Sequence, residues 1–171
     1  MKQHLPNLLT LLNLASGSLG TILALKGHLT LAALCIWIGG VLDFLDGWMA
    51  RMLRAYSPLG QQLDSLADLV TFGLLPAHIM YALIDQYTPS TYVPLFSLLI
   101  PIFSALRLAR FNIDPTQRNE FRGLPTPAAG LFVSTLPWII AANRYAWLTT
   151  VLTQPAVLAG IAVAVAGLLV A

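Results

Sequence analysis

Charged residues are scarce in this chain of 171 residues: Asp, Glu, Lys and Arg make up 9% of it, whereas a soluble domain carries about 25%. A net charge of +2 without a dense basic run argues against a nucleic-acid-binding protein. A single cysteine, Cys35, excludes an intrachain disulfide. Hydrophobic residues, in contrast, make up 57% of the chain. The composition therefore indicates an integral membrane protein.

Long apolar runs recur from one end of the chain to the other. A membrane-spanning helix needs roughly 20 mostly apolar residues. We expect an all-α integral membrane protein, a single domain over residues 1–171 in which six transmembrane helices form one bundle. The last run reaches Ala171 without a polar tail, which is compatible with a natural chain that continues further. The predicted spans are 5–25, 29–53, 61–84, 92–111, 128–143 and 147–171.

Basic residues are divided unevenly between the two ends of the predicted bundle. Seven lie at the end that holds the N-terminus and two at the other end. Because loops rich in Lys and Arg stay in the cytoplasm, we expect a cytoplasmic N-terminus in a cell inner (cytoplasmic) membrane. The first group is Lys2, Arg51, Arg54, Arg107, Arg110, Arg118 and Arg122, and the second is Lys26 and Arg144.

Four aspartates stand within the segment DFLDGWMARMLRAYSPLGQQLDSLAD, residues 43–68. Residues three and four apart share one face of a helix. Asp43 and Asp46 therefore form a stripe at the end of the second span, and Asp64 and Asp68 form one at the start of the third. The polar break RAYSPLG between the spans lets these helices pack antiparallel. The two pairs of carboxylates then face each other, at the cytoplasmic side of the membrane.

Four unpaired carboxylates packed together would repel one another and are costly next to lipid. A bound cation removes both problems. Oxygen ligands suit Mg²⁺, Mn²⁺ or Ca²⁺, and no His or Cys stands at the spacing that zinc needs. Four carboxylates can hold two divalent ions, and such a pair can neutralise a diphosphate. We expect two ions, Mg²⁺ or Mn²⁺, with Ca²⁺ as a substitute in crystals.

Small residues and one arginine continue the acidic stripe of the second span. Gly47 and Ala50 share a face with Asp43 and leave room for a flat or bulky group to approach the backbone. The guanidinium of Arg51, one helical step further, can pair with phosphate oxygens. A helix–helix contact does not account for four aspartates on two adjoining helix ends. A divalent-cation transporter, the non-enzyme alternative, does not need Gly47, Ala50 and Arg51.

The frame D-x-x-D-G-x-x-A-R, then eight residues, then G-x-x-x-D-x-x-x-D resembles the signature of the CDP-alcohol phosphotransferases, integral membrane enzymes of phospholipid synthesis. The resemblance covers the helix layout and hence most of the chain. It implies that an acceptor hydroxyl attacks a phosphorus of a CDP-linked lipid and that CMP leaves. It also implies a homodimer.

The resemblance further implies a role for each motif residue. Asp43, Asp46, Asp64 and Asp68 would be the metal ligands, and Asp68, a partial ligand, would be the catalytic general base. The residues implied to contact the CDP-lipid are Gly47 and Ala50, which make space for cytidine, Arg51 at the diphosphate, and Gly60.

Three further stretches resemble the bacterial and archaeal phosphatidylserine synthases of this family: residues 6–13, 104–112 and 121–130. These enzymes join CDP-diacylglycerol and L-serine, giving phosphatidylserine and CMP. Arg107 and Arg110, three apart on one helix, can bind the carboxylate of serine. Arginines equally suit the phosphate of glycerol-3-phosphate or inositol phosphate, so both alternative acceptors stay open.

The first span carries polar and small residues among its leucines. Asn13, with Asn7 and Thr10, either lines the nucleotide pocket or bonds to neighbouring helices, and both interpretations stay open. Gly17 and Gly20 predict close packing of this span against its neighbours.

Overall fold

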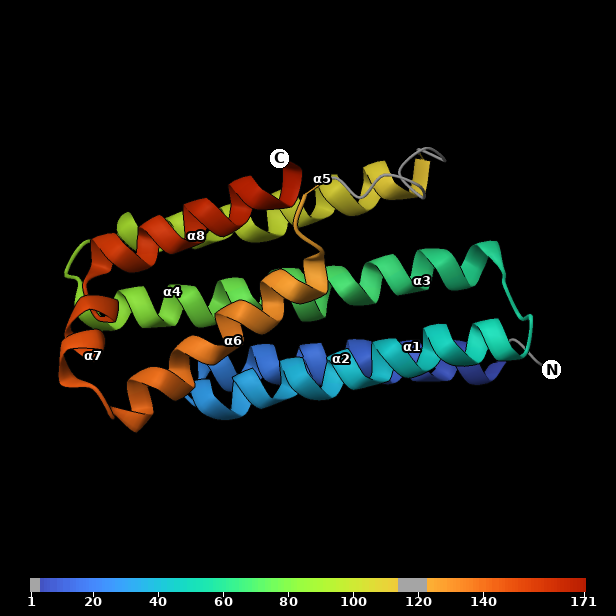
Figure 1. The fold of residues 1–171 in the computed structure, drawn as a ribbon, viewed down its shortest axis with the longest axis horizontal. Helices are drawn as coiled ribbons and strands as arrows, with labels where there is room; N and C mark the ends of the chain where they lie inside the picture. The colour runs from blue at the N-terminus through green and yellow to red at the C-terminus, as the bar shows by residue number, and fades with distance from the viewer. Residues whose placement is uncertain (1–3, 114–122) are drawn as a thin grey trace.

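The computed structural model describes residues 4–113 and 123–171, and in these ranges every regular element is a helix. The helices lie along one long axis, with α1 and α2 on one side, α3 and α4 in the middle, and α5 and α8 on the other side (Figure 1). The elements are α1 His4–Leu25, α2 Leu29–Met52, α3 Pro58–Asp68, η1 Leu69–Leu74, α4 Leu75–Tyr87, η2 Val93–Leu98, α5 Leu99–Ile113, α6 Thr126–Ala142, α7 Ala146–Leu152 and α8 Pro155–Val170.

Four helical stretches are long and apolar enough to cross a membrane, and a fifth is reached if α7 and α8 count as one span. The apolar helix bundle is thus confirmed, whereas six spans and the cytoplasmic N-terminus stay predictions. α6 has only 17 residues. The segment predicted as one span over 147–171 is two helices bent by 70°, because Pro155 begins a new helix there.

The predicted break between the second and third spans is confirmed: α2 ends at Met52 and α3 begins at Pro58. The Ser57 hydroxyl accepts a hydrogen bond of 3.0 Å from the Gly60 N–H and so caps the start of α3. Proline is favoured in a first helical turn, where its missing N–H costs nothing. Capping therefore starts α3 ahead of the predicted residue 61.

The rod formed by α3, η1 and α4 runs through the middle of the bundle. About two thirds of its most apolar window, 67%, is buried by other helices, against 28% for α1. The rod contains a π-helical segment, η1, which begins directly after Asp68. Such segments are rare and occur frequently at functional sites. The sequence pattern did not predict it.

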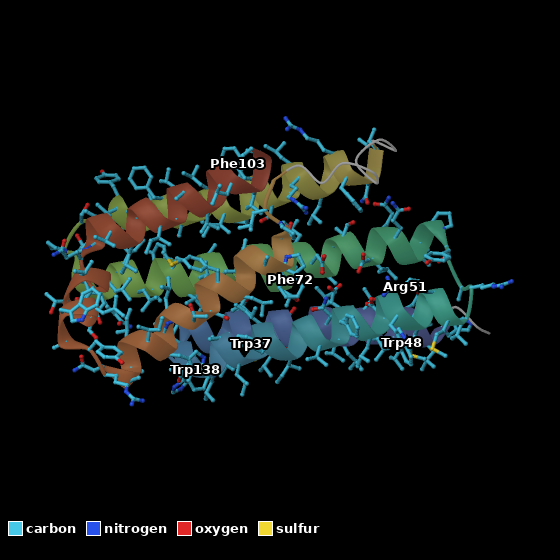
Figure 2. All side chains as sticks on the ribbon, in the orientation of Figure 1. Trp37, Trp48, Arg51, Phe72, Phe103 and Trp138 are labelled. Carbon is cyan, nitrogen blue, oxygen red and sulfur yellow. The ribbon has the colours of Figure 1, made fainter. Side chains whose placement is uncertain are left out.

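The apolar core and the acidic residues occupy different parts of the bundle. Phe72, Leu75 and Ile79 are fully buried in the core, and Figure 2 shows Phe72 in the middle of the molecule. α6 begins and α8 ends about midway along the bundle, and the Leu124 N–H donates to the Leu168 carbonyl there at 2.7 Å. Among the described residues, the end of the bundle that holds the α2–α3 turn is therefore surrounded by α1, α2, α3 and α5.

Large aromatic side chains cover the outside of the bundle. Trp37, Trp48 and Trp138, which are labelled in Figure 2, are each about half exposed. Inside, glycines let helices approach closely: a Cβ atom on Gly20 would lie 2.8 Å from the Cβ of Cys35 in α2. This contact confirms the predicted packing role of Gly20.

Candidate metal centre and nucleotide cavity

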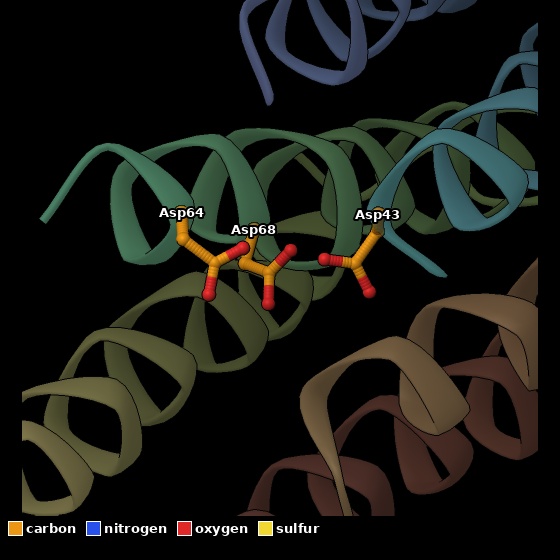
Figure 3. Close-up of side chains that lie close together, drawn as sticks. All are labelled: Asp43, Asp64 and Asp68. Atoms are coloured by element: carbon orange, nitrogen blue, oxygen red, sulfur yellow. The ribbon is translucent and has the colours of Figure 1, made fainter. Parts of the chain in front are cut away.

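Three aspartates from two helices meet near the α2–α3 end of the bundle. Asp43 projects from α2, and Asp64 and Asp68 project from α3, one turn apart (Figure 3). Each contributes one carboxylate oxygen to a group in which all three oxygens lie within 4.8 Å of one another. The antiparallel packing of α2 and α3 thus brings together side chains that are distant in sequence.

Asp68 is the most deeply placed of the three. Its side chain is buried, whereas Asp43 and Asp64 are partly exposed. Its Oδ1 atom is completely covered and has no hydrogen-bond partner among the described residues. A buried carboxylate oxygen without a partner is costly, so a ligand or proton at this position would stabilise it.

The fourth aspartate, Asp46, is buried one turn along α2 and lies outside this group of three. Its Oδ2 atom accepts a hydrogen bond of 2.6 Å from the Thr10 hydroxyl of α1. Short hydrogen bonds to a carboxylate are strong. Asp46 is therefore oriented by α1, and it faces the cavity described next.

A cavity of about 1080 Å³ opens beside the carboxylates, between α1, α2 and α3. Its volume is at the upper end of the range for small-molecule sites, roughly 300–1,000 Å³. Asp68 is not among its lining residues. These are Pro6, Asn7, Thr10, Asp43, Phe44, Asp46, Gly47, Ala50, Arg51, Ala55, Tyr56, Ser57, Pro58, Gly60, Gln61, Asp64 and Phe111.

The two motif glycines face this cavity in different ways. A Cβ atom on Gly47 would meet only Nη1 of Arg51, at 3.7 Å, so the space before it is open. A Cβ on Gly60 would lie 3.0 Å from Oγ of Ser57 and 3.1 Å from Oδ1 of Asn7. Gly60 therefore also allows α3 to approach α1, whereas the space beside Gly47 stays open.

The arginines that the sequence analysis assigned to substrate binding lie in different parts of the structure. Arg51 is exposed and lines the cavity beside Gly47. Arg107 is half-buried, donates to the Thr126 hydroxyl at 3.3 Å and interacts electrostatically with Asp68. Arg110 is exposed in the last turn of α5, and neither Arg107 nor Arg110 is among the lining residues of the cavity. Lys2, Arg118 and Arg122 lie outside the described residues.

The polar residues of the first span are divided between the cavity and the helix interfaces. Asn7 and Thr10 line the cavity. Asn13 is fully buried, and its amide lies deeper, with neither polar atom hydrogen-bonded within the described part of the chain. Its role at the nucleotide stays a prediction.

Some lining residues were not singled out from the sequence. Gln61 precedes Asp64 by three residues and therefore shares its helix face, a periodicity that could have identified it. Phe111 comes from α5, and no local pattern indicates that this helix end reaches a cavity formed by α1, α2 and α3.

The acidic group fits a divalent cation. Two oxygens on opposite sides of one such ion stand about 4–5 Å apart, from metal–oxygen distances of 2.0–2.6 Å. The three aspartate oxygens meet this limit. The free Oδ1 of Asp68 and the absence of histidine or cysteine from the described group match a hard, oxygen-preferring ion.

The CDP-alcohol phosphatidyltransferase family matches residues 3–168, and the chain belongs to this family. The resemblance inferred from the aspartate frame is thus confirmed. The chain is similar to the CDP-diacylglycerol–serine O-phosphatidyltransferase of Mycobacterium leprae strain TN, at 41% identity over 138 residues, 77% of this chain and 45% of the relative.

Two further relatives come from distant organisms. The CDP-diacylglycerol–serine O-phosphatidyltransferase of Bacillus subtilis strain 168 is 39% identical over 128 residues, which cover 75% of this chain and 72% of the relative. The archaetidylserine synthase of Methanothermobacter thermautotrophicus is 36% identical over 135 residues, 77% of this chain and 56% of the relative. The chain thus spans only about half the length of two of these three relatives.

Proposed function

We propose that this chain transfers a phosphatidyl group from CDP-diacylglycerol to the hydroxyl of L-serine, giving phosphatidylserine and CMP. The observation that carries the proposal is the group of three aspartates beside a cavity of about 1080 Å³. Membership of the CDP-alcohol phosphatidyltransferase family favours this transferase over a divalent-cation transporter.

Two divalent ions, Mg²⁺ or Mn²⁺, would be held by Asp43, Asp64 and Asp68, with Asp46 at the neighbouring position. When bound, such ions neutralise the diphosphate and stabilise charge on the leaving phosphate. The open space at Gly47 and Ala50 would receive the cytidine. Arg51, which lines the same cavity, would pair with the diphosphate.

Asp68 would act as the general base. It has two carboxylate oxygens, so one can serve as a ligand while the other accepts the proton of the serine hydroxyl. The serine oxygen then forms a bond to the phosphatidyl phosphorus, and the bond from this phosphorus to the bridging oxygen breaks. CMP leaves with that oxygen and its electron pair.

L-serine as the acceptor is supported by the names of the relatives from Mycobacterium leprae and Bacillus subtilis. Arg107 is the better placed of the two α5 arginines to bind its carboxylate, because it interacts with Asp68 and Thr126. Arg110, in the last turn of the same helix, would be the second arginine that contacts the acceptor.

We further propose that the protein is a homodimer of the cytoplasmic membrane and that its site faces the cytoplasm. The excess of Lys and Arg in the sequence segments predicted for the end with the N-terminus supports this orientation. There, CMP and serine could exchange with the cytosol while the acyl chains of the lipid stay in the bilayer.

The test uses purified protein with CDP-diacylglycerol and Mg²⁺ or Mn²⁺. L-serine, glycerol-3-phosphate and inositol phosphate are supplied in turn, and CMP release and the lipid product are measured. Of the three acceptors, we expect only L-serine to give CMP and a lipid product, phosphatidylserine. Both products should be lost when a chelator is added. CMP release with another acceptor in place of L-serine would assign that acceptor to the enzyme. Ion flux into liposomes without any CMP release would overturn the proposal that the protein is a transferase.

A further inference from the structure

Thr71 occupies a junction of three helical elements. It lies in the π-helical segment η1, one turn after Asp68, and its side chain is fully buried. Its hydroxyl donates a hydrogen bond of 3.1 Å to the backbone carbonyl of Asn13 in α1. A hydroxyl of the central rod is thus fixed to the backbone of the first helix.

Two glycines form the seat for this side chain. A Cβ atom on Gly17 of α1 would lie 2.8 Å from the Cα of Thr71. A Cβ on Gly39 of α2 would overlap the Thr71 methyl group and lie 2.8 Å from Oδ1 of Asn13. Real Cβ atoms essentially never approach other atoms so closely, so a larger residue at Gly17 would push against the backbone of Thr71, and one at Gly39 would displace the side chains of Thr71 and Asn13.

This seat lies about one helical turn from the acidic group, both along α2 and along the rod formed by α3, η1 and α4. Gly39 precedes Asp43 by four residues on α2, and Thr71 follows Asp68 by three residues on the rod. Residues four apart share a face of an α-helix, so Gly39 and Asp43 lie on one face of α2, and Thr71 lies in the first turn of η1 after Asp68. The contact between Gly39 and Thr71 is therefore the packing contact next along the chain, on both elements, from the place where Asp43 meets Asp68.

We propose that Thr71 is a positioning residue of the metal centre. Seated between Gly17 and Gly39, it fixes the register of α3 against α2, so that Asp43 meets Asp64 and Asp68. The effect of this register on metal binding rests on the proposed function.

The surroundings of η1 explain why the register needs such a lock. A π-helical segment interrupts the regular hydrogen-bond ladder of a helix, so its geometry depends on its neighbours. A Cβ on Gly130 of α6 would lie 3.1 Å from Phe72, and a Cβ on Gly73 would lie 3.2 Å from the Cβ of Ser104 in α5. Segment η1 is thus held tightly on each side, and Thr71 provides its contact with α1 and α2.

Gly39→Ala tests the proposal, with Gly40→Ala as the matched control. The control adds the same methyl group to the next residue, where the nearest atoms are those of the Phe72 ring at 3.9 Å. Binding of Mn²⁺ to the purified protein is measured by electron paramagnetic resonance. We expect Gly39→Ala to weaken Mn²⁺ binding about tenfold or more, because mutation of a group that orients metal ligands typically costs this much affinity. Gly40→Ala should leave Mn²⁺ binding unchanged.

Two further variants keep the test decisive if Gly39→Ala does not fold. Thr71→Ala removes the hydroxyl and the methyl without adding bulk, and we expect it to weaken Mn²⁺ binding as well. Thr71→Ser makes room for the methyl of Gly39→Ala, so the double variant should recover part of the affinity. Unchanged Mn²⁺ binding in a folded Gly39→Ala or Thr71→Ala variant would overturn the proposal.

A second measurement works without metal. Asp43→Cys and Asp64→Cys are combined in a Cys35→Ala background, and the rate of linkage by a short bifunctional methanethiosulfonate is followed. We expect Gly39→Ala to slow linkage several-fold and Gly40→Ala to have no effect. Equal linkage rates with and without Gly39→Ala would refute the proposal that Thr71 fixes the register of α3 against α2. If the wild type itself binds no Mn²⁺, the metal-dependent function fails, and the linkage rates alone decide the role of Thr71.

Discussion

The hydroxyl of Thr10 donates a hydrogen bond of 2.6 Å to Oδ2 of Asp46, joining α1 to the acidic stripe of α2. The same hydroxyl lies 3.1 Å from the Pro6 carbonyl, but the carboxylate is the closer and stronger acceptor. We expect Thr10→Val to lower the rate of CMP release about tenfold or more, because an Asp46 carboxylate without this donor is no longer oriented. The measurement is CMP release as a function of Mg²⁺ concentration.

The control for this prediction is Thr21→Val in the same helix. The Thr21 hydroxyl donates to the Gly17 carbonyl of its own helix, at 3.0 Å, and not to the acidic group. Its removal should leave the Mg²⁺ dependence unchanged. A Thr10→Val variant with the wild-type Mg²⁺ dependence would show that the bond does not serve the metal centre.

Asp68→Asn and Asp64→Asn remove charge from the acidic group without changing its volume. We expect each to reduce CMP release by about 10²-fold or more, since a positioned general base alone contributes this much. Asp85→Asn, an exposed aspartate in α4, is the matched control and should retain full activity. Helix content by circular dichroism checks folding, and normal turnover in either of the first two variants would refute their roles.

Gly47→Val would place a side chain in the open space of the cavity. The protein should still fold, because the nearest atom to a Cβ there is Nη1 of Arg51 at 3.7 Å. The KM for CDP-diacylglycerol should rise about tenfold or more, since forcing extra atoms into an occupied site costs about 1–3 kcal/mol. Gly160→Val in α8, where nothing lies within 4 Å of a Cβ, is the control. An unchanged KM for Gly47→Val would place the nucleotide elsewhere.

Arg107→Lys keeps the charge but loses the planar fork that binds a carboxylate with two hydrogen bonds. We expect the KM for L-serine to rise about tenfold, while the KM for CDP-diacylglycerol stays the same. Arg110→Lys, on the exposed last turn of α5, should have a smaller effect. The opposite order of the two effects would assign the acceptor to Arg110.

The sequence frame predicted that Asp43 approaches Asp64 and Asp68, because helix periodicity and the break before Pro58 are local properties. It did not predict that Asp46 would turn toward Thr10 and leave three aspartates in the group. That choice depends on how α1 lies against α2. The bend at Pro155 was readable in principle, since proline disrupts a helix, but hydropathy alone hid it.

The sequence by itself determined the apolar helices, the acidic stripes and the family, because composition and residue spacing act along one helix at a time. Only the tertiary structure decided how deeply each carboxylate lies, that Phe111 of α5 reaches the cavity, and that Thr71 sits between Gly17 and Gly39. These features arise from close contacts between helices that are distant in sequence. Such contacts depend on the shapes of all the packed side chains together, and no local pattern specifies them.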